Sequence, residues 1–226
     1  MKRFALKRRT AFTLAEVLIT LGIIGIVAAM TIPTLIGNIQ DIQFRSQFYK
    51  SYSLIKQTLK KMEADDIPLA PGDYTNGSRY DDPFYRKFEN YLTNINDSGI
   101  KEGAPPVTYQ TLTGNSTYDS SLIDDGCFTL PGGSMIMFEQ PGNMTVKRIW
   151  IYVDVNGVKL PNRLGRDLFV FQMTDDGLKP MGADGTSYDE DTYCNKTGSG
   201  NMNGIACAAK VIKDPQYFKW IKRVGD

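Results

Sequence analysis

The hydrophobic pattern divides the chain into three parts, and the first is apolar on every side. Residues 11–39 contain one charged side chain, Glu16, and the 24 residues 17–40 contain none. At about 1.5 Å of rise per residue, a helix of that length extends roughly 36 Å, more than the ~30 Å hydrocarbon core of a bilayer. The pattern predicts a membrane-spanning helix over residues 12–40, with a kink or local loosening at Pro33.

The second part continues the helix with one apolar face. The spacing predicts a single helix from about Phe12 to Glu63, and its second half must bury its apolar stripe against another element, of which a sheet is the obvious one. Downstream of residue 40, apolar side chains recur every three or four positions with Lys, Arg, Gln and Asp between them: Ile42, Tyr49, Tyr52, Ile55, Leu59 and Met62.

In the third part, short apolar runs alternate with turn residues. A short helix is expected near 83–93 with Phe84, Phe88 and Leu92 inward, and another over 205–212 with an amphipathic turn after Pro215. The expected fold class is α+β, a long helix packed on an antiparallel sheet in a soluble head domain, residues 41–226. Strands are predicted at 107–112, 127–130, 134–140, 147–155 and 168–174, with turns at Pro131-Gly132-Gly133 and Pro141-Gly142-Asn143.

A basic leader, residues 1–11, precedes the apolar stretch. It carries Lys2, Arg3, Lys7, Arg8 and Arg9 and no acidic residue. Cationic flanks stay in the cytoplasm, so the chain is expected to cross the membrane once and to export its head.

Glu16 is costly beside a run of Val, Leu and Ile unless a partner offsets its charge. The order of features is a basic leader, the small residue Ala11, Phe-Thr-Leu-Ala-Glu at 12–16 and about 20 apolar residues. This order resembles the N-terminal signature of type IV prepilins and type II secretion pseudopilins. The resemblance covers the first fifth of the chain and implies a pilin-like fold.

In that family a prepilin peptidase cuts before the Phe and methylates the new N-terminus. The resemblance implies cleavage between Ala11 and Phe12, N-methylation of Phe12, and pairing of Glu16 with the N-terminal amine of a neighbouring subunit. Most members have Gly where this chain has Ala11. The implied partners are the peptidase, homologous pilin or pseudopilin subunits, an inner-membrane assembly platform and, before assembly, the lipid bilayer of the bacterial cytoplasmic membrane. The head would lie in the periplasm or at the cell surface.

Two plainer interpretations compete with this one. An ordinary secretory signal would use Val27-Ala28-Ala29 as its cleavage site and release a chain that starts at Met30. An uncleaved signal anchor would keep Met1. The charge within the apolar stretch and the apolar residues that continue to Ile39 argue against the first, and the Phe-Thr-Leu start and Glu16 are left unexplained by the second.

Composition narrows the function classes. Five of the 26 basic residues lie in the leader, which leaves 21 basic against 25 acidic residues in the mature chain and argues against a nucleic-acid-coating surface. The chain contains no His, so catalysis by Ser-His-Asp or Cys-His groups is excluded, and no catalytic residue is expected.

The three cysteines suit an exported chain. Cys194 and Cys207 enclose a loop rich in Gly and Asn and are the favoured disulfide pair, with Cys127 as a buried strand thiol. Pairing of Cys127 with either of the other two is the alternative.

Oxygen-bearing side chains gather around one chain reversal, Asp154, Asn156, Asn162 and Asp167. Such a set suits a Ca²⁺ ion, and the simpler interpretation is that these side chains cap their own turns. The other acidic residues, Asp184, Asp189, Glu190 and Asp191, are expected in a solvated loop.

The sequence therefore predicts a prepilin-like structural subunit that assembles through its N-terminal helix into a type IV pilus or a type II secretion pseudopilus. The alternative is a membrane-anchored extracellular binding protein, such as a calcium-dependent adhesin, that does not polymerise.

Overall fold

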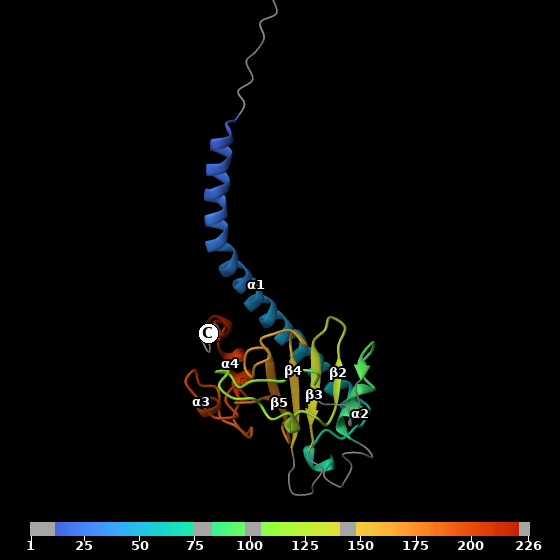
Figure 1. Cartoon of the computed structure of the whole chain (residues 1–226). Coiled ribbons are helices and arrows are strands. Elements are labelled where there is room, and N and C mark those ends of the chain that lie inside the picture. Colours follow the sequence, from blue (N-terminus) through green and yellow to red (C-terminus); the bar gives the residue numbers. More distant parts are fainter. Residues whose placement is uncertain (1–11, 75–82, 98–104, 141–147, 222–226) are drawn as a thin grey trace, which may run out of the picture. The chain divides into compact units, whose positions relative to one another are not determined.

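A computed structural model of the chain describes residues 12–74, 83–97, 105–140 and 148–221. It confirms the α+β class, with one long helix and an antiparallel sheet (Figure 1). The chain divides into two compact units at Asp41 and Ile42, and the second unit is the head. The helices are α1 Leu14–Ala64, α2 Phe84–Glu89, α3 Glu190–Tyr193, α4 Cys207–Lys213 and α5 Tyr217–Ile221, with single 3₁₀ turns at Pro71–Tyr74 and Ser120–Leu122.

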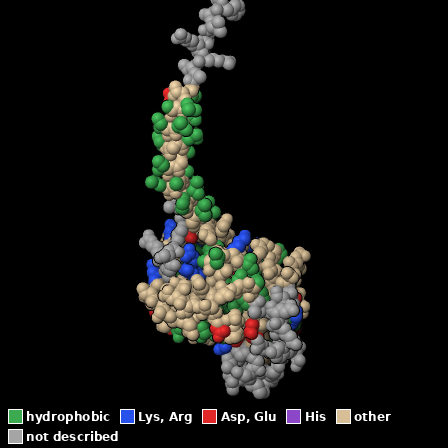
Figure 2. All heavy atoms as spheres, viewed as in Figure 1, with side chains coloured by type: hydrophobic (Ala, Val, Ile, Leu, Met, Phe, Trp, Pro, Cys, Tyr) green, Lys and Arg blue, Asp and Glu red, His purple; other side chains and the backbone are tan. Residues whose placement is uncertain are grey.

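Helix α1 matches its predicted bounds to within two residues and runs through Pro33. Its apolar N-terminal part is long enough to cross a membrane by length and composition. Between Val17 and Ile39 every Val, Leu, Ile and Met side chain is at least 44% exposed. Figure 2 shows these hydrophobic side chains on the visible face of the helix.

The six strands pair in sequence order, each antiparallel to the next. The turn at 131–133 joins β2 to β3 as predicted, whereas the predicted turn at 141–143 lies outside the described residues. The strands are β1 Asn96–Asp97, β2 Cys127–Thr129, β3 Met135–Glu139, β4 Ile149–Asp154, β5 Leu168–Thr174 and β6 Gly177–Pro180.

Both faces of the sheet are buried, which explains why its central strands are apolar throughout. On β4, Ile149, Ile151 and Val153 face the core that contains the α1 stripe, and Trp150 and Tyr152 face a second core. The first core holds Phe44, Phe48, Ile55, Leu59 and Met62 from α1. The second is closed by irregular chain that includes Tyr109, Tyr118, Ile123, Met181 and Ile205.

The predicted strand at 107–112 was wrong. Its backbone pairs with several separate segments instead of one strand, because Gln110 N donates to Asn162 O and Leu112 N donates to Asn203 O. Within the described ranges, Gln110 forms isolated bridges with Thr117 and Arg163. This segment packs as irregular chain over the second core.

The expectations for the short helix near 83–93, the acidic loop and the edge strands have different outcomes. Phe84 and Phe88 on α2 are buried as predicted, and Leu92 packs from beyond the end of the helix. The predicted acidic loop is partly helical, because Asp189 caps α3 by accepting a hydrogen bond from Thr192 N at 2.8 Å. Strands β1 and β6 were not predicted, since neither contains an apolar run.

The structure joins Cys194 to Cys207 in a disulfide that ties the start of α4 to the end of α3, with 5.0 Å between their Cα atoms. Cys127 is buried in β2 and is not part of this disulfide.

Reducing the disulfide is expected to lower the free energy of unfolding by about 3 kcal/mol, because the closed loop no longer restricts the unfolded chain. Urea unfolding with and without dithiothreitol measures the effect. The Cys194→Ala/Cys207→Ala variant is the control, and its unfolding should not respond to the reductant. An equal response of both proteins would contradict the assignment.

Candidate functional site

The first turn of α1 contains a reciprocal hydrogen-bonded pair, Thr13 and Glu16. The Thr13 backbone N and Oγ1 each donate to Glu16 Oε2 at 2.8 Å, and Glu16 N donates to Thr13 Oγ1 at 3.2 Å. The Thr13 carbonyl accepts the helical hydrogen bond from Val17 N. This is a capping box, in which two otherwise unpaired backbone donors at the helix start are satisfied by side chains.

The capping box places the Glu16 carboxylate at the positive end of the helix dipole, which favours a negative charge. The two donors from Thr13 supply polar partners for the charged group beside the apolar residues that begin at Val17. Phe12, one residue before the box, is 87% exposed. Thus the predicted new N-terminus and the predicted assembly carboxylate lie within one turn of each other.

Ala11, the residue before the predicted cut, lies outside the described residues. Thr13 was not singled out as a functional residue from the sequence. The signal was present, because Thr13-Leu14-Ala15-Glu16 has the Ser/Thr-x-x-Glu spacing of a capping box.

Comparison with known proteins is consistent with this site. Residues 6–32 match the family model described as the prokaryotic N-terminal methylation motif. Searches of curated proteins and of solved structures found no match. The chain therefore carries the N-terminal signature of type IV prepilins and pseudopilins, and that motif together with the apolar helix fits a membrane-anchored precursor.

The predicted oxygen cluster forms around the loop between β4 and β5. Asp154 Oδ1 accepts hydrogen bonds from Asn156 N at 3.0 Å and Gly157 N at 2.7 Å. The Asp167 carboxylate accepts hydrogen bonds from Asn162 N at 2.7 Å and from Arg163 N at 2.6 Å. These contacts are the turn caps of the simpler interpretation, and Ca²⁺ binding remains a prediction that the structure does not test.

Tyr109 completes the cluster from another segment, since its hydroxyl donates to Asp154 Oδ2 at 2.6 Å. Both carboxylates are fully buried. Burial, reinforced by the nearby Asp167 carboxylate, raises the pKa of Asp154 to about 8. Burial also raises the pKa of Asp167 to about 6, although the hydrogen bonds that it accepts from Arg163 N and Asn162 N act to lower it.

We expect the free energy of unfolding to fall as the pH rises from about 4 to 8. A carboxyl whose pKa is raised by folding binds more protons in the folded state over this range, so stability is lost up to about the folded-state pKa, by at most ~1.4 kcal/mol per pH unit for one group. The Asp154→Asn variant should show a smaller slope, because the amide oxygen still accepts Asn156 N and Gly157 N without titrating. Chemical unfolding at several pH values measures both slopes. Equal slopes would show that Asp154 does not titrate as described.

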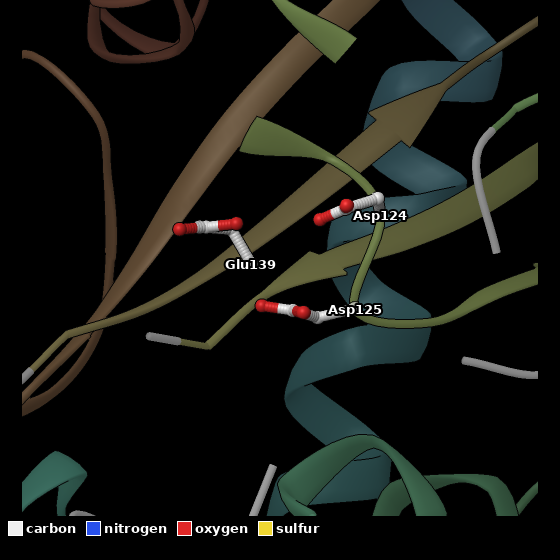
Figure 3. Close-up of side chains that lie close together, drawn as sticks. All are labelled: Asp124, Asp125 and Glu139. Atoms are coloured by element: carbon white, nitrogen blue, oxygen red, sulfur yellow. The ribbon is translucent and has the colours of Figure 1, made fainter. Parts of the chain in front are cut away.

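A second acidic group was missed by sequence reasoning. One carboxylate oxygen from each of Asp124, Asp125 and Glu139 lies within 4.8 Å of the other two, an arrangement that could hold a metal ion (Figure 3). Gln140 N donates a hydrogen bond to Asp125 Oδ2 at 2.6 Å, and Arg148 Nη2 lies 3.3 Å from Glu139 Oε1. Burial and the Asp125 charge raise the pKa of Glu139 to about 7. Only the fold brings these residues together, since Glu139 ends β3 and the two aspartates precede β2.

Proposed function

We propose that the protein is a structural subunit of a pilin-type filament, either a type IV pilus or a type II secretion pseudopilus. It is made as a membrane precursor, cleaved before Phe12, methylated on the new amine, and assembled through α1. The observation that carries this proposal is the methylation motif at residues 6–32, which includes Phe12 and the capped Glu16.

The exposed apolar surface of α1 supports assembly. Because the side chains between Val17 and Ile39 have few contacts of their own, they are stable only when lipid or other apolar helices cover them. Lipid covers them before assembly, and the same segments of neighbouring subunits cover them in the filament. Contacts that repeat from head to tail without closing into a ring produce such a filament.

In the filament, Glu16 leaves the donors of Thr13 and pairs with the Phe12 amine of a neighbouring subunit. A charge pair in an apolar surrounding discriminates strongly between matched and mismatched positions, so it sets the axial register of the helices. The exported head then forms the outer surface of the filament.

Mass spectrometry of the mature N-terminus tests the proposal. The expected product starts at Phe12 and carries one added methyl group. A variant with a bulky residue before the cut, Ala11→Trp, is expected to retain the leader, whereas Ala11→Gly should be processed like the natural chain. A product that starts at Met30, or an intact Met1 in cells with an active prepilin peptidase, would overturn the proposal.

A further inference from the structure

The loop between β4 and β5 presents two apolar side chains to solvent. Val158 is 57% and Leu160 is 77% exposed, and Lys159 between them is also exposed. Among the large hydrophobic residues described between 43 and 221, these two alone are more than half exposed. We refer to residues 158–160 as the tip.

The tip is held in one conformation by the oxygen cluster beneath it. Asn156 Nδ2 donates to the carbonyls of Lys159 at 2.7 Å and Leu160 at 3.1 Å. Gly157 has a φ of +68°, and a Cβ there would lie 2.0 Å from the carbonyl oxygen of Gly133. The apolar side chains are therefore presented on a fixed backbone, so that binding them orders little additional chain.

A pocket of about 290 Å³ lies on the same head. Its walls include Val107, Tyr109, Thr117, Tyr118 and Ile123, and none of the described residues that line it carries a formal charge. We refer to it as the Tyr109 pocket. Its volume is at the lower limit of small-molecule sites, about 300 Å³, and suits one or two aliphatic side chains.

The tip and the Tyr109 pocket also match in charge. Asp119 lies between the lining residues Tyr118 and Ser120 and is exposed. Its carboxylate accepts a hydrogen bond from Ser121 N, which lowers the pKa of the carboxyl. It is therefore anionic at neutral pH, whereas the centre of the tip, Lys159, is cationic. A comparable groove of about 310 Å³ is lined by Lys50 and Lys61 and would repel that lysine.

We propose that the tip of one subunit inserts into the Tyr109 pocket of a second copy of this chain, with Lys159 of the first facing Asp119 of the second. The two features are rigidly connected, since Tyr109 lines the pocket and also donates to Asp154, which binds the base of the tip loop. Each head therefore offers a tip to one neighbour and a pocket to the next, in a fixed relative position. The inference rests on the proposed function, to which it adds a specific contact between heads.

Cysteine cross-linking of the full-length chain in detergent tests the contact without requiring filaments. A chain with both Leu160→Cys and Thr117→Cys, treated with a short bis-maleimide, should form a ladder of dimers, trimers and larger species. A mixture of the two single variants should form dimers only. The control pair, Leu160→Cys with Gln57→Cys on α1, should cross-link at least tenfold less. If the double variant forms dimers and no larger species, the head-to-tail arrangement is wrong.

Charge exchange distinguishes a specific contact from apolar association. Adding Lys159→Glu to the double-cysteine chain should reduce cross-linking at least tenfold, and adding Asp119→Lys as well should restore it. Unchanged cross-linking in the Lys159→Glu chain would overturn the charge match. If filaments form but the double-cysteine chain does not cross-link, the tip contact is wrong and the proposed function stands. If the chain cross-links but is neither cleaved before Phe12 nor assembled into filaments in cells with an active prepilin peptidase, the contact stands and the proposed function is wrong.

Discussion

Glu16→Ala is expected to leave cleavage before Phe12 largely intact and to remove most of the protein from filaments. In the proposed filament, alanine leaves the Phe12 ammonium of the neighbouring subunit without a partner in an apolar surrounding. An uncompensated buried charge costs about 3–5 kcal/mol, equivalent to roughly a hundredfold or more in the assembly equilibrium. The measurement is the fraction of mature protein recovered in sheared filaments, with the mature N-terminus determined on the same sample.

Two control variants separate pairing from helix capping. Glu16→Ala also removes the capping box, which contributes about 1 kcal/mol to the helix start. Thr13→Ala removes the Thr13 hydroxyl, which donates to Glu16 Oε2 and accepts from Glu16 N, but it keeps the carboxylate and the Thr13 backbone N–H, so it should assemble far better than Glu16→Ala. Glu63→Ala, an exposed acid near the other end of α1, should assemble normally. Normal filament incorporation of Glu16→Ala would sink the pairing model, and equal defects in Thr13→Ala would assign the effect to capping.

Phe48→Ala is expected to destabilise the head more than any change on its surface. The Phe48 ring is fully buried between α1 and β5, with its centroid 4.8 Å from that of Phe169 and 5.7 Å from that of Phe171. Removing a buried phenyl ring and leaving a cavity costs about 3–5 kcal/mol, a large part of the 5–15 kcal/mol that stabilises a typical domain.

Denaturant unfolding of the full chain in detergent, followed by tryptophan fluorescence, to which buried Trp150 contributes, measures this change. Gln57→Ala, an exposed position on the same helix, is the matched control and should change the free energy of unfolding by less than about 0.5 kcal/mol. A cost below 1 kcal/mol for Phe48→Ala would contradict the packing of α1 on β5. If Phe48→Ala is cleaved normally but fails to assemble, the unfolded head explains the failure, and the result does not bear on the contacts within the filament.

The sequence by itself determined the features that depend on neighbouring residues. The length of the apolar run defines a helix that can span a membrane, and the three- and four-residue spacing after residue 40 identifies the face that α1 buries. The methylation motif was recognised because its residues are contiguous. The central strands β2 to β5 were predicted for the same reason, since each is a continuous apolar run between turn residues.

Only the tertiary structure decided where distant residues meet. Strand β6 exists because β5 offers it hydrogen-bonding partners, and residues 107–112 are irregular because their backbone donors and acceptors pair with three separate segments. Tyr109 and Asp154 form a hydrogen bond although they are 45 positions apart in the sequence. Asp124, Asp125 and Glu139 meet only when β2 and β3 pair. Such contacts depend on long-range packing, which no local pattern of residues specifies.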